Sequence, residues 1–290
     1  MKNLKKKINY FLQFVFIFFL LIILKLLGLK ISRFVSGKIF SIIGPFFRSS
    51  KITSTNIEKA FPNENDKFKK KTMSEMWLMY GKILAEYNFM KKFRINKLEN
   101  NIEVEGQGEI EKIKNSNQPA IFISGHFDNF ELMAMHIEKS GLDLATIYRP
   151  LNNEFLNPLM EYIRKKYICK NQIKKGLSGT KDLLKHFKLG TSIALMIDQR
   201  VSEGIKSKFF GKDAFTTTIP AQFVKKFNCK IVPVYIERKK DDNFKLKFYR
   251  PLSFSKNDNI ETITSHLNLI LEKMIISNPS QWIWTHDRWK

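Results

Sequence analysis

The strongest constraint on the fold is a regular succession of apolar runs and amphipathic segments between residues 119 and 276. The apolar runs have the length of strands, the segments between them have helical periodicity, and glycine or polar residues separate most of them. We expect strands at 119–125, 142–148, 191–198, 229–238 and 243–250, and helices at 129–141, 157–167, 180–190, 219–228 and 259–276. Such alternation predicts an α/β fold with a mixed, largely parallel sheet flanked by helices.

The rest of the chain completes a simple domain organisation. Residues 51–95 are predicted to be largely helical, because Met73, Trp77, Tyr80 and Leu84 recur at a spacing of three to four. Residues 199–214 are predicted to form a glycine-containing loop. We divide the chain into an anchor (1–30), a helical membrane-proximal region (31–98) and an α/β body (99–290), with 31–290 forming one compact domain.

The N-terminal segment predicts attachment to a membrane. Lysines at positions 2, 5, 6 and 7 precede an apolar run from Tyr10 to Leu24. As a helix this run covers about 22 Å, less than the ~30 Å hydrocarbon core of a bilayer. A cleaved signal peptide is the competing interpretation, but Lys25, Lys30 and Arg33 follow the run in place of a small-residue cleavage site. We expect an uncleaved anchor, spanning or half-buried, with the body on the cytoplasmic side.

A second apolar stretch, "FSIIGPFF" at 40–47, either extends the contact with the bilayer or forms a buried loop.

Charge and cysteine content narrow the partners. Lys and Arg number 50 against 27 Asp and Glu, a net charge of +23 that favours nucleic acid, anionic lipid or an acidic carrier protein. A nucleic-acid-binding protein would need a basic face interleaved with exposed aromatic residues or a recognised binding fold, and the sequence shows neither. Cys169 and Cys229 stand apart from any CxxC or Cys/His cluster. We therefore predict no metal site, no disulfide framework and no cofactor.

The stretch "GHFDNFE" at 125–131 carries the main candidate for catalysis. His126 lies where a buried strand ends, the usual place for ligands and catalytic groups in open α/β sheets. Positions five apart on one helix lie about 140° apart, so His126 must precede the helix if its ring is to meet Glu131. Glu131 would then hold one ring N–H and leave the other nitrogen free as a base. An ordinary strand-to-helix turn explains the same residues, and Asp128 is either a helix cap or a second carboxylate near the ring.

This motif resembles the H-x4-D/E motif of membrane glycerolipid acyltransferases. It is closer to the lipid A biosynthesis acyltransferase family, the late lauroyl and myristoyl transferases, because further blocks follow in that family's order. Two departures are Asp128, where many members have a small residue, and Asp287, where a second basic residue is common. The matching blocks are "TNIEKAFPN" (55–63), "YRPLNNEFLNPLMEYIR" (148–164), "LMIDQR" (195–200), "FFGKDAFTTTIPAQFVKKFNCKIVPVYIER" (209–238) and "WIWTHDRWK" (282–290).

The resemblance implies an acyltransferase at the inner membrane, with its body on the cytoplasmic face. It implies transfer of a fatty acyl group from acyl carrier protein to a hydroxyl of a phosphorylated, Kdo-bearing lipid A precursor, with anionic membrane lipids as further partners. His126 would be the general base and Glu131 would stabilise its imidazolium. We expect direct attack without an acyl-enzyme. The alternatives are a glycerophospholipid, aminolipid or glycolipid acceptor, with acyl-CoA as a possible donor, or an inactive scaffold.

Several residues are expected to bind substrate. Arg149 follows a strand, as His126 does, and would hold a phosphate or an oxyanion, or else form a structural ion pair. Asp198, also at a strand end, would orient Arg149 or a substrate hydroxyl, or cap the next segment. Gly211 would shape a loop near the acyl chain with Phe209 and Phe210, and the C-terminal tryptophans would lie at the membrane interface or close the core. The remaining predicted substrate-binding residues are Tyr148, Asn129 and Gln199.

Overall fold

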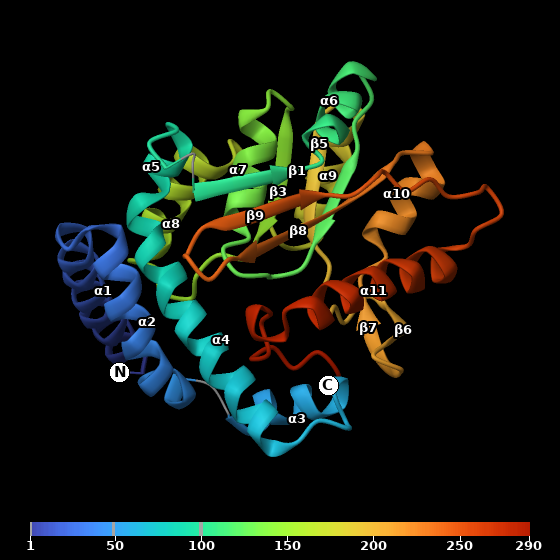
Figure 1. Ribbon diagram of the computed structural model, residues 1–290. Coiled ribbons are helices and arrows are strands. Elements are labelled where there is room, and N and C mark those ends of the chain that lie inside the picture. Colours follow the sequence, from blue (N-terminus) through green and yellow to red (C-terminus); the bar gives the residue numbers. More distant parts are fainter. Residues whose placement is uncertain (1, 48–49, 99–100) are drawn as a thin grey trace.

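A computed structural model describes residues 2–47, 50–98 and 101–290 of the chain (Figure 1). Its centre is a seven-stranded sheet in the order β1-β9-β8-β2-β5-β3-β4. Neighbouring strands are parallel except for β8 and β9, so the predicted mixed, largely parallel sheet is confirmed. The strands are β1 (Ile102–Glu105), β2 (Ile121–Ser124), β3 (Leu144–Tyr148), β4 (Asn171–Lys174), β5 (Ser192–Met196), β8 (Ile231–Arg238) and β9 (Phe244–Phe248).

Helices cover the sheet, and in the view of Figure 1 α6 and α7 lie above β8 and β9 while α4 and α11 lie below. Every helix expected between residues 129 and 276 is present. Their apolar stripes face the sheet; α7, for example, buries Leu132, Met133 and Ile137. The helices of this part of the chain are α6 (Gln107–Asn115), α7 (Glu131–Lys139), α8 (Asn157–Ile163), α9 (Leu177–Lys188), α10 (Ile219–Phe227) and α11 (Ile260–Ser277).

The expected loop at 199–214 is wrong, because its second half forms a β-hairpin that continues to residue 216. Strands β6 (Ile205–Phe209) and β7 (Lys212–Thr216) pair antiparallel. The turn between them is Phe210–Gly211, and both residues have positive φ, 51° and 70°. This conformation matches the right-handed twist of a two-residue hairpin turn, and glycine adopts it at little cost. Asn268 of α11 fixes the hairpin through its amide, which donates to Ser207 Oγ, Thr216 Oγ1 and the Lys208 carbonyl.

The N-terminal third is helical, as predicted. Helices α2 and α4 pack so closely that only glycine fits at two positions. A Cβ on Gly81 would lie 2.2 Å from the backbone carbonyl oxygen of Ser36, and one on Gly44 would lie 2.3 Å from the side-chain ring of Trp77. This contact binds α2 firmly to the body. The elements are α1 (Lys2–Leu26), α2 (Gly28–Phe47), α3 (Ser50–Ala60), α4 (Asp66–Glu86), the 3-10 turn η1 (Tyr87–Phe89) and α5 (Met90–Arg94).

The C-terminal segment returns to the core. Trp282 and Trp284 are fully buried, and their rings meet edge to face with centroids 4.6 Å apart. Phe127, next to the candidate histidine, forms an isolated β-bridge with Trp282. Of the two roles expected for the terminal tryptophans, Trp282 and Trp284 therefore close the core.

Candidate active site

Three predicted residues lie at one edge of the sheet. His126 follows β2, Arg149 follows β3 and Asp198 follows β5, and these strands are neighbours in the order β2-β5-β3. Because the strands are parallel, their carboxyl ends meet at the same edge. The expectation that His126 and Arg149 project at one edge therefore agrees with the strand order.

The loop that carries His126 is fixed by tight packing. A Cβ on Gly125 would lie 2.8 Å from the ring of Phe127, which is itself fully buried. Asp128 has a φ of +36°, and its backbone N–H donates to the Gln281 carbonyl at 2.9 Å. The loop thus leaves β2 in one defined direction and presents His126 ahead of α7.

Asp198 holds His126 by both its backbone and its ring. His126 Nδ1 lies 2.8 Å from Asp198 Oδ1, and the His126 backbone N–H donates to Asp198 Oδ2 at 2.9 Å. Trp282 Nε1 donates to the same Oδ2 at 2.8 Å. Asp198 is completely buried, whereas the His126 side chain keeps 21 % of its surface exposed. The Nδ1 side of the imidazole therefore lies against buried Asp198, and another part of the ring is accessible to solvent.

The charge of Asp198 sets the tautomer of His126. Burial raises the pKa of this carboxyl group, but the adjacent His126 and the hydrogen bonds from His126 and Trp282 outweigh burial and bring the pKa to about 2. An ionised carboxylate only accepts hydrogen bonds, so we assign the proton of the neutral ring to Nδ1. Nε2 then carries the free lone pair, as a general base requires.

Glu131 does not occupy the place that its sequence spacing suggested. Its Oε1 accepts hydrogen bonds from the Tyr87 hydroxyl at 2.7 Å and from Arg164 Nε at 2.8 Å. The structure differs here from the expectation that Glu131 orients His126. Asp198 is the carboxylate that contacts His126 Nδ1, and Glu131, in the first turn of α7, contacts Tyr87 and Arg164. The ring of Phe130 packs edge-on against that of His126, with centroids 4.7 Å apart.

Glu131 and its partners form a buried charged cluster. Burial and the carboxylate of Glu131 raise the pKa of Tyr87, which therefore stays a neutral hydrogen-bond donor. Burial lowers the pKa of Arg164, but the attraction of Glu131 more than compensates. Arg164 begins the π-helical turn Arg164–Ile168 that ends the helix predicted at 157–167, and wider turns of this kind often lie at functional sites.

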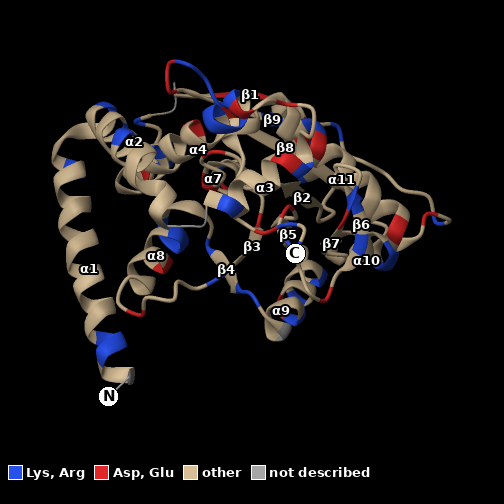
Figure 2. Ribbon diagram, turned by 90° about the horizontal axis from the view of Figure 1, so that it is seen from below, with Lys and Arg blue, Asp and Glu red and all other residues tan. Residues whose placement is uncertain are grey.

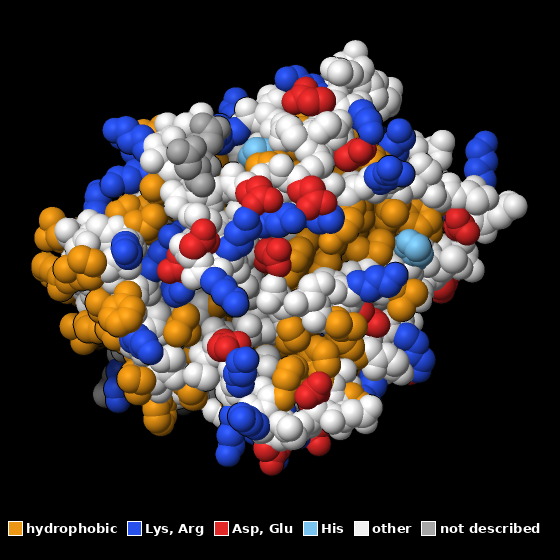
Figure 3. Space-filling model, in the orientation of Figure 1, with side chains coloured by type: hydrophobic (Ala, Val, Ile, Leu, Met, Phe, Trp, Pro, Cys, Tyr) orange, Lys and Arg blue, Asp and Glu red, His pale blue; other side chains and the backbone are white. Residues whose placement is uncertain are grey.

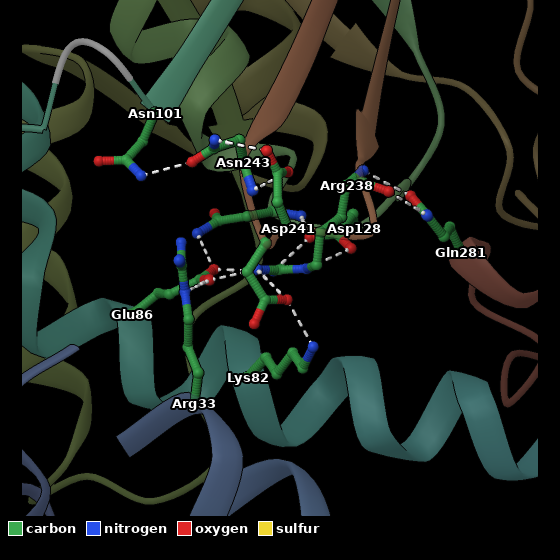
Figure 4. A network of polar contacts seen from close by, with 11 residues as sticks. Arg33, Lys82, Glu86, Asn101, Asp128, Arg238, Asp241, Asn243 and Gln281 are labelled. Atoms are coloured by element: carbon green, nitrogen blue, oxygen red, sulfur yellow. Dashed lines mark hydrogen bonds and ion pairs between the residues drawn. The ribbon is translucent and has the colours of Figure 1, made fainter. Parts of the chain in front are cut away.

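Asp128 and Asn129 belong to a different buried network. Figure 4 shows Asp128 in this network with Arg238 and Glu86. Asp128 forms an ion pair with Arg238, with Oδ1 2.6 Å from Nη2, so it neither caps α7 nor touches the imidazole. Asn129, predicted to bind substrate, donates through Nδ2 to Glu86 Oε2 at 2.7 Å and is fully buried. A substrate role for Asn129 would require this network to open.

The network joins α2 to the His126 loop through alternating charges. Arg33 Nε of α2 donates to Glu86 Oε1 at 2.6 Å, and Arg238 Nη1 donates to the same oxygen at 2.6 Å. Two guanidinium groups therefore face the two carboxylates of Glu86 and Asp128. Burial raises the pKa of Glu86, but Arg238 and Arg33 together lower it below its ordinary value.

The other predicted substrate residues are less closely organised. Arg149 is exposed, and no ion pair of Arg149 occurs among the described residues. Tyr148 is buried and donates through its hydroxyl to Glu161 Oε1 at 2.6 Å. Gln199 is half-buried beside Asp198. Gly211 lies in the β6–β7 turn described above, with no neighbour within 4 Å of an added Cβ. Roles for these residues in binding substrate stay predictions.

The C-terminal segment supplies a site residue that the sequence reasoning did not assign. His286 Nε2 accepts a hydrogen bond from the Arg200 backbone N–H at 2.9 Å, two residues beyond Asp198. Asn56 of α3 donates to the carbonyls of Trp284 and His286 at 2.9 and 2.7 Å. Burial lowers the pKa of His286, and both Asp198 and His126 are close enough to act on it. The sequence signal for His286 was its place in the block "WIWTHDRWK". This block contacts the block "TNIEKAFPN" through Asn56.

Neither cysteine lies at this edge, because Cys169 precedes β4 and Cys229 precedes β8. Burial raises the thiol pKa of Cys169 and of Cys229 to about 12, so neither is an activated nucleophile. Within residues 2–47, 50–98 and 101–290, no group of three His, Cys, Asp or Glu side chains is arranged to hold a metal ion.

Comparison with known proteins identifies the family. Residues 2–290 match the family model of the bacterial lipid A biosynthesis acyltransferases. The lipid A biosynthesis palmitoleoyltransferase of Escherichia coli K12 is 23 % identical over 262 residues, which are 89 % of this chain and 84 % of the relative. The lauroyltransferase of the same organism is 24 % identical over 251 residues, 84 % of this chain and 79 % of the relative. A lipid A biosynthesis acyltransferase of Haemophilus influenzae is 24 % identical over 258 residues, 88 % of this chain and 81 % of the relative. The chain belongs to the bacterial lipid A biosynthesis acyltransferase family and is an acyltransferase.

Proposed function

We propose that this enzyme transfers a fatty acyl group from an acyl carrier protein thioester to a hydroxyl group of a phosphorylated, Kdo-bearing lipid A precursor. Family membership supports a lipid A type of acceptor. The observation that carries the catalytic part is the His126–Asp198 pair. Nδ1 lies 2.8 Å from the carboxylate, and Nε2 has no hydrogen-bond partner among the described residues.

The reaction follows from the protonation states at this pair. The acceptor hydroxyl attacks the thioester carbonyl, a C–O bond forms, and the hydroxyl proton moves to His126 Nε2. Asp198, kept ionised by its surroundings, stabilises the imidazolium. The tetrahedral intermediate then breaks its C–S bond, and the carrier thiolate takes the proton from Nε2. The neutral ring is restored, and no acyl-enzyme forms.

Glu131 has a separate role in this proposal. It fixes the guanidinium of Arg164 and the hydroxyl of Tyr87 beside the start of α7. A preorganised cation can stabilise negative charge on a substrate without reorganising during the reaction. We therefore propose that Glu131 acts through Arg164 and that Arg149 supplies a second, more exposed positive charge for a phosphate.

Basic residues near the site fit an acidic carrier protein and a phosphorylated acceptor. In Figure 2, Lys and Arg segments lie along the end of β4 and on α9. Lys174 ends β4, the strand beside β3, and Lys175 follows it. Lys175 is close enough to His286 to lower its pKa. Anionic lipid of the inner membrane would be attracted in the same way, with the body on the cytoplasmic face.

Two experiments test the proposal. Purified enzyme is supplied with a radiolabelled fatty acyl group bound as a thioester to either acyl carrier protein or coenzyme A. The acceptor is either a Kdo-lipid A precursor or a glycerophospholipid, and the products are separated. We expect transfer from the carrier protein to the lipid A precursor, and loss of that transfer in His126→Ala. Mass spectrometry of lipid A from cells with and without the gene gives the second readout. Unchanged lipid A acylation, or transfer only to a glycerophospholipid, would contradict the proposal.

A further inference from the structure

We propose that α1 lies in one leaflet of the membrane, parallel to its surface, together with the outer face of α2, and that α1 does not cross the bilayer. The partner of this surface is the hydrocarbon region beneath the lipid headgroups. The inference concerns how the enzyme meets lipid, and it holds whichever acyl donor and acceptor the enzyme uses.

The two helices share an exposed apolar surface, which we call the membrane face. Orange side chains gather on the side of the molecule formed by α1 and α2 in Figure 3. Phe16 of α1 and Phe46 of α2 are 70 % and 86 % exposed. Aromatic and aliphatic residues at this exposure, on neighbouring helices, mark a lipid or protein contact. The membrane face consists of Leu12, Phe16, Phe19, Ile23 and Leu26 on α1 and Ile31, Phe34, Ile42 and Phe46 on α2.

Helix α1 is held at two points, by the body in its first half and by α2 in its last turns. In its first half, Asn153 Nδ2 donates to the Tyr10 carbonyl at 2.9 Å, and the Phe155 ring meets that of Phe11 with centroids 5.6 Å apart. In its last turns, Leu24 is 1 % exposed and its carbonyl accepts a hydrogen bond from Ser32 of α2. Tyr10 and Leu24 are about 21 Å apart along a helix. The helix therefore lies along the side of the body, as Figure 2 shows.

Helix α2 cannot leave the body to accompany a spanning α1. Its inner face is locked against α4 by the close approach of Gly81 to Ser36. Arg33, on the same inner face, is buried with Glu86 at 2.6 Å, and removing one partner of a buried ion pair leaves an uncompensated charge. Only the outer face of α2 remains for lipid.

A spanning α1 would carry polar parts of the body into hydrocarbon. If α1 crossed the bilayer while held at Tyr10 and Leu24, the body would have to follow it over about 21 Å of depth. The first turns of α1 border a hollow of about 240 Å³ that is lined by Lys6, Lys7 and Glu154 among others. Even a single charged residue at the bilayer centre costs several kcal/mol. These groups fit the headgroup region instead.

A single leaflet has room for a helix lying flat. One leaflet contributes about 15 Å of hydrocarbon, half of the ~30 Å core, and a helix with side chains is about 10–12 Å across. The long side chains of Lys6, Lys7 and Lys25 can reach the headgroups from that depth. Submersion also explains why α1 is apolar around its whole circumference from Phe14 to Leu24, unlike an amphipathic helix that rests in the interface.

Depth measurements along α1 test the placement. The full-length protein is reconstituted in vesicles of phosphatidylethanolamine and phosphatidylglycerol, in a background with Cys169→Ala and Cys229→Ala. Spin labels are placed one at a time at Leu12, Phe16, Phe19 and Ile23, and collision with oxygen and a polar nickel complex gives the depth. We expect similar depths at all four positions, none beyond one leaflet. A depth that passes through the bilayer centre toward the opposite surface would overturn the proposal.

Sidedness gives an independent readout. Asn3→Cys, at the start of α1, is compared with the matched reference Lys188→Cys, an exposed position at the end of α9. We expect a membrane-impermeant maleimide to label both from the same side of sealed vesicles; labelling from opposite sides would overturn the proposal. If the cysteine-free background does not fold, protease protection of an N-terminal tag on the native chain gives the same information. Release of the protein by alkaline carbonate would also overturn it.

Discussion

Replacing Asp198 with asparagine is expected to abolish the base function of His126 by changing its tautomer. The carboxylate accepts three hydrogen bonds: His126 Nδ1 at Oδ1, and the His126 backbone N–H and Trp282 Nε1 at Oδ2. An amide has only one oxygen, so Asp198→Asn must present its NH2 group to one of these two sides.

The hydrogen bonds decide which side the amide oxygen takes. If the NH2 group replaces Oδ2, two buried N–H donors lose their acceptor, at about 1–3 kcal/mol each. If it replaces Oδ1, both donors keep their acceptor and only the imidazole must adapt, by presenting a lone pair at Nδ1. Because two donors would otherwise lose their acceptor, the second arrangement is favoured by about 2–6 kcal/mol. The ring proton then moves to Nε2, where the base is needed, and such a wrong tautomer costs about 10⁴ in kcat in hydrolases with this pair.

The assay combines acyl-transfer kinetics with ¹⁵N NMR of histidine-labelled protein. We expect Asp198→Asn to lower kcat by about three to four orders of magnitude and to move the His126 proton from Nδ1 to Nε2. Asp182→Asn, on the exposed side of α9, is the matched control. Glu131→Gln is expected to lower activity through Arg164 and to leave the tautomer unchanged. The reasoning is refuted if folded Asp198→Asn keeps more than a tenth of wild-type kcat, or if Glu131→Gln changes the tautomer.

Four further outcomes are expected. Glu86→Gln leaves two buried guanidinium groups facing one carboxylate and should cost about 3–5 kcal/mol of unfolding free energy in denaturant titrations; adding Arg33→Met restores the balance of charge, so a double mutant no better than the sum of the singles would contradict the network. Because the pKa of Glu86 is lowered in the folded protein, Glu86 contributes to the free energy of unfolding at pH values above the ordinary pKa of a glutamate. This contribution is lost as the pH falls through the lower pKa of the folded state. Acid titration should therefore show a weaker pH dependence of stability in Glu86→Gln than in wild type. His286→Ala removes the acceptor of the Arg200 N–H and should lower kcat about tenfold, the equivalent of one hydrogen bond, and an unchanged kcat would separate His286 from the site. Gly81→Ala should destabilise the protein by about 1–3 kcal/mol or more by forcing α2 from α4, whereas Gly108→Ala in α6, with open space around its Cβ, should be neutral or stabilising.

Periodicity predicted the fold because the central strands are buried on both faces. β2, β5 and β8 are almost entirely buried and read as continuous apolar runs, so they stand out in the sequence. β4, "NQIK", is an edge strand with a single buried residue, and β1, "IEVE", at the other edge has none. The β6–β7 hairpin was missed for the same reason, since lysine and aspartate occupy its exposed positions. A short strand that is exposed on one side has few apolar residues, so hydrophobic periodicity does not reveal it.

The site was predictable only as far as local sequence determines it. The position of His126 follows from where a buried strand ends, and that part of the geometry agrees with the structure. Its partner Asp198 is 72 residues away and becomes a neighbour only because β5 pairs with β2. Strand order is a property of the whole sheet, so a spacing of five residues could suggest Glu131 but could not reveal Asp198.

The same reasoning explains what the five-residue spacing does fix. It places Glu131 in the first turn of α7, where the helix dipole favours a carboxylate, and within reach of Tyr87 and Arg164. Tyr87 belongs to η1, which follows α4, and α4 carries the Glu86 network and the glycine contact with α2. In the proposed mechanism the two carboxylates therefore have different tasks. Asp198 sets the protonation state of His126, and Glu131 connects Arg164 to Tyr87, which follows α4. A change at α2 that loosens its contact with α4 should therefore reach the reaction through Glu131 and Arg164 while the His126 tautomer stays the same.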